Sequence, residues 1–150
     1  MRLLIQRVGF TRLRVENRLH AEIGPGALVL IGIRNGDTKS DADYLVKKLI
    51  HLRIFPDHEN KMNLSLLDCG AELMLVSQFT LYASTKKGNR PSFLDSAKPE
   101  AALPLYQYFI EACHLLVPEK VKSGIFGADM NIELLNSGPV SILIDSQEKE

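Results

Sequence analysis

Polar side chains interrupt an apolar stretch in the middle of the chain, at residues 71–81 (AELMLVSQFTL). Four apolar residues are followed by two hydroxyls, one primary amide and one aromatic ring, on Ser77, Gln78, Phe79 and Thr80. A polar group that is buried without a partner costs about 1–3 kcal/mol. These side chains must therefore be hydrogen-bonded or face a cleft, which makes this strand end the first candidate site. The alternative is a strand end that hydroxyls cap before an ordinary turn.

The composition predicts one globular domain that spans residues 1–150. The chain has 150 residues, of which 45% are hydrophobic, and this is enough to bury a single core. Lys plus Arg and Asp plus Glu both number 18, so the formal net charge is zero. A neutral chain has no overall field that would attract nucleic acid or an anionic membrane. Any contact with RNA must come from a local basic patch.

Cysteine usage predicts a reducing, cytoplasmic location. Cys69 and Cys113 are not arranged as CxxC, and no secretory hydrophobic segment follows Met1. Both thiols are expected to be inert. No run of residues approaches the roughly 18 apolar positions of a membrane span, so no membrane partner is predicted.

Four early strands follow from runs of branched aliphatic residues and from period-two alternation. Gly9 separates the first two, and apolar residues alternate with charged ones in the second. A tight turn at Asn17-Arg18 predicts a hairpin. Gly32, inside the apolar run ALVLIGI, indicates a close approach of another backbone. The predicted strands cover residues 2–8, 10–16, 19–23 and 27–33.

Two helices are predicted from apolar residues that recur every three or four positions. The first begins at Ser40, where Ser40 and Asp43 have the spacing of a capping box, and its apolar stripe runs to Ile50. The second covers residues 99–117. Pro99 suits a first turn, whereas Pro104 predicts a kink or a start closer to residue 103.

The remaining segments complete an α+β fold. We expect a layered β/β/α sandwich of two curved sheets, with two main helices on one outer face. A doubly wound parallel sheet fits the early hairpin less well. The other expected segments are a short strand at 53–55, polar connections at 56–63 and 83–93, an irregular segment at 120–126, strands at 130–135 and 140–144 with an interruption at 136–139, and a frayed tail from residue 146.

Most familiar sites are missing from the sequence. HExxH, GxSxG and glycine-rich phosphate loops have no match, and the 4 histidines are scattered. We therefore predict no metal and no cofactor. Lys86, Lys87 and Arg90 cluster in the long loop, near Tyr82 and Phe93. Such a cluster is either a solvated face or a site for an RNA phosphate backbone.

Two motifs have to be considered together. Residues 77–81 (SQFTL) and 136–141 (NSGPVS) resemble the paired signatures SQFTL and NxGPxT of the D-aminoacyl-tRNA deacylases. The similarity continues in order through MRxxxQRV at the amino terminus, IGPG at 23–26, KMN at 61–63, KKGNRPSF at 86–93 and GADM at 127–130. It covers nearly the whole chain, and the pair of motifs is far more specific than either motif alone.

The resemblance implies a homodimeric hydrolase that cleaves the ester between a D-amino acid and the terminal ribose of tRNA. The implied partners are the 3′ end of an aminoacyl-tRNA and a second copy of the chain. The residues of the implied catalytic pocket are Thr80, Ser77, Gln78 and Phe79. The residues expected to contact the tRNA are Lys86, Lys87 and Arg90.

Chiral selection is implied to rest on a main-chain element. In the family the Gly-Pro peptide is cis and reaches into the active site of the other subunit, so Gly138-Pro139 is expected to do so here. Arg7 is implied to orient it, and Met130 and Asn136 belong to the same substrate-binding set. A rigid wall of this kind rejects an L side chain by a clash, yet it cannot exclude glycine. We therefore expect activity on glycyl-tRNA, including glycine mischarged on tRNA(Ala).

Hydrolysis of an ester requires stabilisation of an oxyanion, and backbone N–H groups near Phe79 and Thr80 are candidates. A hydroxyl without a general base is a weak nucleophile. We therefore favour assistance by the 2′-hydroxyl of the terminal ribose, with Thr80 positioning the substrate. The sequence departs from the family at Ser141, where threonine is usual, and at Ser137, where aspartate is common. Serine lacks the methyl group that stiffens χ1, which bears on how firmly the Gly-Pro element is held.

Two other functions remain open. One is a sister deacylase that acts on achiral or wrongly paired aminoacyl-tRNA, a group that departs from SQFTL and favours a trans Gly-Pro peptide. The intact SQFTL argues against it. The other is a catalytically silent module that keeps the fold and binds tRNA or DNA.

Overall fold

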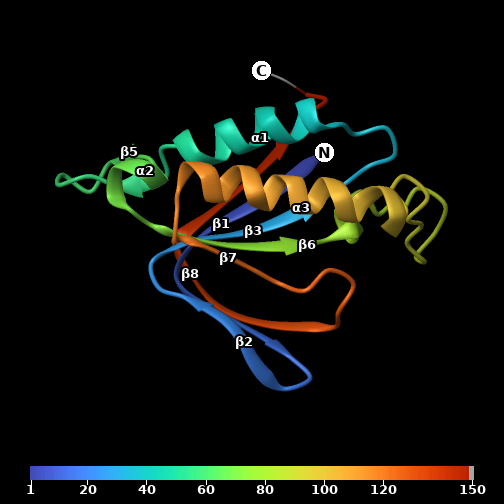
Figure 1. Cartoon of the computed structure of the whole chain (residues 1–150), viewed down its shortest axis with the longest axis horizontal. Coiled ribbons are helices and arrows are strands. Elements are labelled where there is room, and N and C mark those ends of the chain that lie inside the picture. The colour runs from blue at the N-terminus through green and yellow to red at the C-terminus, as the bar shows by residue number, and fades with distance from the viewer. Residues whose placement is uncertain (149–150) are drawn as a thin grey trace.

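One mixed sheet of six strands organises the computed structural model, which describes residues 1–148 (Figure 1). The sheet follows the path β2-β1-β3-β6-β7, and β8 pairs with β1. The strands are β1 (Arg2–Val15), β2 (Arg18–Ile23), β3 (Gly26–Gly32), β4 (Phe55–Pro56), β5 (Met62–Leu64), β6 (Glu72–Ser77), β7 (Val121–Ser123) and β8 (Met130–Asp145). The helices are α1 (Lys39–His51), α2 (Leu66–Cys69) and α3 (Pro99–Leu116), with the 3₁₀ helix η1 (Phe79–Tyr82). This confirms the predicted α+β class.

Strand β1 replaces the two strands predicted at 2–8 and 10–16, because the backbone stays extended through Gly9. The first half of β1 lies between β3 and β8, and the second half lies between β2 and β8. The pairing with β8 is irregular between Gln6 and Thr11, and such irregularities bend strands. Glu16 and Asn17, with φ of 50° and 62°, form the turn into β2, one residue earlier than predicted. The sheet therefore bends along β1 and β8, which run through both of its halves.

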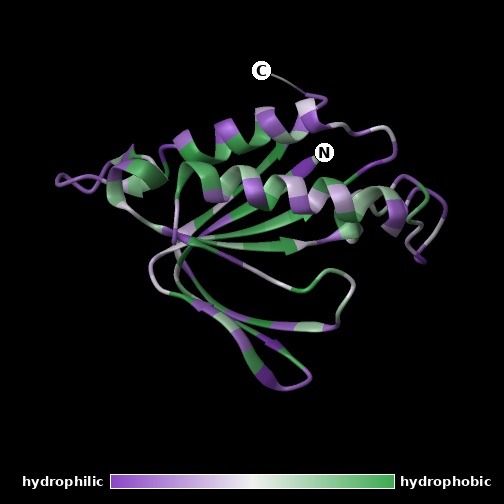
Figure 2. Cartoon of the chain, in the orientation of Figure 1, coloured by the Kyte–Doolittle hydropathy of each residue, from purple (hydrophilic) through white to green (hydrophobic). Residues whose placement is uncertain are grey.

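Two apolar clusters fill the two sides of this bend. The larger cluster joins the sheet to α1 and α3 and includes Leu45 and Phe109, which are fully buried. The smaller cluster lies between the curved halves of the sheet and includes Leu13 and Met74. Figure 1 shows α1 and α3 side by side over one face, and Figure 2 shows that the strands beneath them are strongly apolar. The predicted layers are confirmed, with the correction that the two curved sheets are continuous.

The strands beneath the helices pair in parallel, β3 with β6 and β6 with β7. Because helices cover one face and the curled half of the sheet covers the other, β3 and β6 are buried on both sides, as their continuous apolar sequences indicate. The segment predicted as irregular at 120–126 contains β7, where Val121 pairs with Leu73. The segment 53–64 forms the small sheet of β4 and β5.

Helix α1 begins earlier than predicted. Thr38 is its N-cap, and the capping box joins Thr38 to Asp41, with the Thr38 N–H donating to Asp41 Oδ2 at 2.9 Å. The box predicted at Ser40 and Asp43 is therefore wrong by two positions. Helix α3 begins at Pro99 and continues through Pro104, so the alternative start near residue 103 is wrong. Among residues 1–148, every helix is too short or too polar to span a lipid bilayer.

The two ends of the described chain are joined at the edge of the sheet. The amino group of Met1 donates to Ser146 Oγ at 2.8 Å and to Asp37 Oδ1 at 2.7 Å. Arg2 Nε donates to Asp145 Oδ2 at 2.6 Å. Ser146 is buried by these contacts, so the prediction of fraying from residue 146 is wrong for Ser146, while residues 149–150 lie outside the described part.

Replacing Asp145 by asparagine is expected to lower the free energy of unfolding at about pH 7 by about 1–3 kcal/mol, since Arg2 loses a charge-assisted hydrogen bond. Burial by itself raises the pKa of Asp145, but hydrogen bonds from the Gln147 N–H and Arg2, and the charges of the amino terminus and Arg2, hold that pKa below its usual value of 3.8. A lowered pKa stabilises the fold above the usual value, and this contribution disappears as the pH falls through the folded pKa.

The wild type and Asp145→Asn should therefore converge in stability in acid. Urea unfolding at about pH 7 and about pH 3 measures the difference between their free energies of unfolding. Glu111→Gln on the exposed face of α3 is the matched control, and its gap to the wild type should stay small at both pH values. A constant gap between the wild type and Asp145→Asn would show that the ion pair does not carry the acid sensitivity.

Candidate functional site

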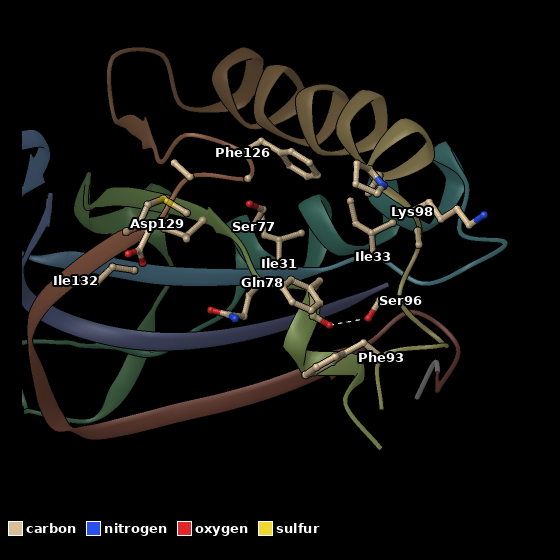
Figure 3. Close-up of a pocket in the computed structure, with 18 residues that line it drawn as sticks. Ile31, Ile33, Ser77, Gln78, Phe93, Ser96, Lys98, Phe126, Asp129 and Ile132 are labelled. Carbon is tan, nitrogen blue, oxygen red and sulfur yellow. Dashed lines mark hydrogen bonds between the residues drawn. The ribbon is translucent and has the colours of Figure 1, made fainter. Parts of the chain in front are cut away.

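The predicted polar strand end opens into a pocket of about 620 Å³ at the carboxyl end of β6 (Figure 3). Ser77, Gln78 and Phe79 line it, and Met130 lines it from the start of β8. The pocket is therefore built where β6 ends, η1 begins and β8 begins. This volume falls within the usual range for pockets that bind small molecules.

The backbone around residue 78 fixes the direction of the chain into the pocket. The Gln78 N–H donates to the Ile31 carbonyl at 2.7 Å, so β6 is held against β3 until the chain turns into η1. A Cβ added at Gly32 would lie 2.9 Å from Leu81 Cβ. This confirms that Gly32 permits a close approach, here between β3 and η1. Ser96 Oγ donates to the Phe79 carbonyl at 2.8 Å and ties η1 to the segment before α3 (Figure 3).

Thr80 lies on η1 and is exposed, beside the lining of the pocket. Its hydroxyl oxygen accepts a hydrogen bond from the Gln78 side-chain amide. Within residues 1–148, no imidazole or carboxylate is hydrogen-bonded to this hydroxyl. The Phe79 and Thr80 N–H groups stand at the start of η1, where a helix leaves its first donors without intrahelical partners.

Helix α3 supports the site from above the sheet. Tyr106 Oη donates to the Leu75 carbonyl at 3.0 Å, at a position where β6 is covered on both faces. Burial raises the pKa of Tyr106 to about 12, so the phenol stays protonated and remains a donor. Burial also raises the pKa of Cys113, on the same helix, to about 12, which keeps that thiol protonated at neutral pH.

Two segments of the pocket were not expected from the sequence. One runs from Phe93 to Ala102, and the other runs from Phe126 to Asp129. Figure 3 shows Phe126 beneath α3 and Phe93 near the hydrogen bond between Ser96 and η1. The sequence signal for both segments is an aromatic residue in a region without periodicity, which is too common to identify a pocket by itself. Among residues 1–148, no three metal-ligating side chains gather at one place.

The predicted interruption at 136–139 is wrong, because these residues belong to β8. Arg7 Nε donates to the Ser137 carbonyl at 3.0 Å, and Arg7 Nη1 donates to the Ile54 carbonyl at 2.7 Å. The Val140 N–H donates to Asn136 Oδ1 at 3.0 Å. These bonds hold an irregular stretch of strand around Gly138, whose φ is +118°.

The prediction of a cis Gly138-Pro139 peptide is wrong for this structure. No peptide bond within residues 1–148 is cis, so this peptide is trans. The physical reason lies in β8, where pairing of Asn136 and Ser141 with β1 keeps the chain extended and the φ of Gly138 absorbs the irregularity. The cis element on which the sequence-based account of chiral selection rests is therefore absent here.

The segment at 136–141 and the pocket lie apart within one chain. Strands β1 and β3 lie between β8 and β6 in the sheet. At the usual strand spacing, β8 and β6 are therefore about 14 Å apart. Gly138 and Pro139 are exposed on the edge strand. At the position where the family usually has threonine, Ser141 Oγ accepts hydrogen bonds from Asn136 Nδ2 at 3.0 Å and Gln6 Nε2 at 3.4 Å. Serine thus keeps the hydroxyl contact. Ser137 contributes its carbonyl to Arg7.

The basic loop lies beyond η1 and outside the pocket. Ser84 and Ser92 exchange backbone hydrogen bonds of 2.8 and 2.9 Å, which closes the loop at its base. Lys86, Lys87 and Arg90 are exposed at its tip. The structure thus places the predicted tRNA-contacting residues next to the pocket-forming helix, without bringing them into the pocket.

Comparison with known proteins defines the class of this fold and site. The structure superposes with a TM-score of 0.92 on a protein described as c-Myc DNA Unwinding Element Binding Protein, at 36% sequence identity and over 97% of this chain and 98% of that chain. A probable eukaryotic D-amino acid tRNA deacylase shares the fold with a TM-score of 0.84 at 20% identity, over 96% of this chain and 98% of that chain. The architecture is that of the deacylases.

The sequence gives the more specific assignment. The family model described as D-Tyr-tRNA(Tyr) deacylase matches residues 4–145. The chain is 52% identical to the D-aminoacyl-tRNA deacylase of Parabacteroides distasonis over 100% of both chains. It is also 52% identical to the enzyme of the same name from Cytophaga hutchinsonii over 98% of both chains. The chain therefore belongs to the D-Tyr-tRNA(Tyr) deacylase family, which confirms the predicted family and enzyme class.

Proposed function

We propose that this chain hydrolyses the ester bond of D-aminoacyl-tRNA and releases free tRNA and a D-amino acid, as part of quality control in cytoplasmic translation. The whole chain, residues 1–150, forms the deacylase domain. One observation carries the proposal: the SQFT residues, within a family match over residues 4–145, line or flank a pocket of about 620 Å³. Relatives at 52% identity bear the name of this activity.

The pocket suits the terminal adenosine of tRNA. Phe79, Phe93 and Phe126 line it, and aromatic side chains stack on unpaired bases. The hydroxyl of Ser77 and the amide of Gln78 supply polar groups beside the aromatic rings, and Ser96, Lys98 and Asp129 also line the pocket. Such a site binds a flat base by stacking and fixes the orientation of the ribose by a few hydrogen bonds.

The ester carbonyl is then placed at η1. The N–H groups of Phe79 and Thr80 stabilise the oxyanion that forms when the carbonyl is attacked, a contribution of roughly 2.7–4 kcal/mol per donor in other enzymes. Thr80 contacts the Gln78 amide, which is no general base in either orientation. The 2′-hydroxyl of the terminal ribose therefore assists the hydrolysis, and Thr80 positions the substrate.

A second copy of the chain completes the site. The edge strand β8 presents Leu135 and Leu143, which are 56% and 60% exposed, on either side of Gly138-Pro139. Exposed apolar residues on an unpaired strand edge are typical of an interface. A homodimer through β8 would bring the segment around Gly138, held by Arg7, to the pocket of the other copy. Met130 lines that pocket from within its own chain.

In such a dimer the segment around Gly138, which Arg7 holds, excludes L side chains by a steric clash. The body of the tRNA lies against the basic loop. The segment acts from Gly138, Pro139 and Asn136, in the trans conformation that the structure has. Exclusion by a clash leaves glycine acceptable. The tRNA backbone is contacted by Lys86, Lys87 and Arg90.

The test compares three charged tRNAs with the purified protein. D-aminoacyl-tRNA and glycyl-tRNA(Ala) should both be hydrolysed, with rates within roughly tenfold of each other, and the L-aminoacyl-tRNA should be at least about 100-fold slower. Single-turnover release of the amino acid measures each rate. Equal rates on D and L substrates would contradict steric selection, and no hydrolysis of any substrate would contradict the enzyme assignment.

The trans peptide favours a second candidate, the sister deacylase that acts on achiral or wrongly paired aminoacyl-tRNA. The intact SQFTL favours the D-specific activity. The same three substrates separate the two, because the sister activity would hydrolyse glycyl-tRNA and leave D-aminoacyl-tRNA unchanged. A silent nucleic-acid-binding module would retain tRNA on a filter without loss of the ester.

A further inference from the structure

A second cavity lies on the other side of η1. It has a volume of about 420 Å³ and is lined by residues from the start of β1, the segment after β3, the end of η1, the basic loop and the segment before α3. Three of its lining residues are cations, Arg2, Arg34 and Lys86, and one is an acid, Asp95. Cations therefore outnumber acids among the lining residues of this concave site, in a chain whose net charge is zero.

The cations of this cavity differ in how they are held. Arg2 is fixed, since Nε pairs with Asp145 at 2.6 Å and Nη1 donates to the Leu81 carbonyl at 3.1 Å. Its guanidinium lies 4.6 Å from the centre of the Tyr82 ring. Within residues 1–148, neither Arg34 nor Lys86 forms a side-chain ion pair, so both charges are available to a ligand.

Neutral groups complete the lining. Ser84 and Thr85 bring hydroxyls from the base of the loop. Tyr82 is 5% exposed, and burial raises the pKa of its phenol well above the usual value, so it adds no negative charge. The cavity thus combines hydroxyl donors with one ion-paired cation and two cations that have no ion pair within residues 1–148, a set that suits phosphate oxygens.

A common wall separates this cavity from the candidate active site. Phe79 lines the first pocket and Tyr82 lines the second, and these residues are the two ends of η1. At the rise of a 3₁₀ helix they are about 6 Å apart along its axis. Ser96 and Asp95 divide in the same way between the two pockets. The two pockets are therefore close enough for neighbouring nucleotides of one strand to reach both.

We propose that the cavity between η1 and the basic loop binds the phosphodiester that precedes the terminal nucleoside of the tRNA substrate, through Arg34, Lys86 and Arg2. The inference rests on the proposed function for the identity of the strand. Asp95 favours the singly charged phosphodiester of RNA over free phosphate, because a carboxylate repels a dianion more strongly and can accept from a ribose hydroxyl or a base amino group.

The experiment measures binding of ligands that carry no aminoacyl ester, so that it does not depend on hydrolysis. Titration calorimetry with the RNA trinucleotide CpCpA, adenosine and inorganic phosphate is carried out on the wild type, Arg34→Gln, Lys86→Gln and the control Arg18→Gln. Arg18 is an exposed cation at the start of β2, away from both pockets. Urea unfolding of each variant confirms that the fold is retained.

The wild type should bind CpCpA at least about tenfold more tightly than adenosine, because charge-assisted hydrogen bonds add to the stacking. Arg34→Gln and Lys86→Gln should each weaken CpCpA binding by roughly fivefold to tenfold and leave adenosine binding within about twofold. Each variant should also reduce the slope of the logarithm of the CpCpA binding constant against the logarithm of the salt concentration by about 0.7. Arg18→Gln should change neither affinity.

Three outcomes would overturn the inference: equal affinity of the wild type for CpCpA and adenosine, equal weakening by Arg34→Gln and Arg18→Gln, or binding of inorganic phosphate as tight as that of CpCpA. The hydrolysis assay tests the proposed function independently of these binding measurements. If CpCpA binding depends on Arg34 but no aminoacyl-tRNA is hydrolysed, the enzyme assignment is wrong and the phosphodiester site stands. If hydrolysis occurs and the wild type binds CpCpA no more tightly than adenosine, the enzyme assignment stands and the phosphodiester site is wrong.

Discussion

Removing the 2′-hydroxyl from the terminal ribose of the substrate is expected to abolish hydrolysis, whereas replacing Thr80 by alanine is expected to leave substantial turnover. The Thr80 hydroxyl contacts only an amide, that of Gln78, among the described residues, and an amide cannot take its proton. A substrate hydroxyl next to the ester can supply the missing acid–base function. Such assistance is worth roughly 100-fold to 10,000-fold in rate.

Single-turnover hydrolysis of D-aminoacyl-tRNA with a ribose or a 2′-deoxyribose terminal nucleotide measures the first effect, and we expect a loss of at least about 1,000-fold. A 2′-deoxy group at the preceding nucleotide is the matched control and should change the rate by less than about twofold. Thr80→Ala should retain the rate within roughly tenfold, since only a positioning hydrogen bond is lost. Loss of activity in Thr80→Ala, combined with normal hydrolysis of the deoxy substrate, would identify Thr80 as the nucleophile.

Replacing Gly138 by alanine is expected to lower the deacylation rate by at least about 100-fold while the protein stays folded. The φ of Gly138 is +118°, a conformation that costs an L residue of order 1–3 kcal/mol. The added Cβ would also overlap the Arg7 guanidinium. Arg7 must then move and give up its hydrogen bonds to the Ser137 and Ile54 carbonyls. If the 136–141 segment contacts the substrate as we propose, its misplacement by about 1 Å is enough for a loss of this size.

Gly36→Ala is the matched control for this effect. Gly36 has a φ of +89°, and an added Cβ would meet nothing within 4 Å, so it carries the backbone cost without the clash. Unfolding midpoints and deacylation rates of both variants should be measured together. Similar losses of activity in Gly36→Ala and Gly138→Ala would show that the effect is a general one of stability. An unchanged rate in Gly138→Ala would remove the 136–141 segment from the site.

Local periodicity accounts for most of the elements that the sequence predicted. Alternation and apolar runs identified the strands around the bend, and a three-to-four spacing identified α1 and α3, because these patterns reflect which side of a strand or helix is buried. The capping box was misplaced because Thr38-Asp41 and Ser40-Asp43 satisfy the same spacing rule, and packing decides between them. Asp43 instead accepts a hydrogen bond from Tyr108 on α3.

The candidate site could be predicted only in part. The sequence alone identified the family, the strand end at Ser77 to Phe79, and Arg7 as the residue that holds the segment around Gly138, since each was recognised from residue types within short motifs. Tertiary structure decided the rest. It brought Phe93 and Phe126 to the pocket, placed two pockets back to back on η1, and kept Gly138-Pro139 trans within β8.

The physical reason is the range over which each feature is determined. The identity of every second residue shows which face of a strand is buried, but it does not show which strand will pair with it. Here β1 pairs with β8, from the opposite end of the chain. The conformation of the 136–141 segment follows from that pairing and from Arg7, more than 100 positions away. The sequence therefore determined which residues are candidates for the site, and the long-range pairing of strands decided where those residues lie in the fold.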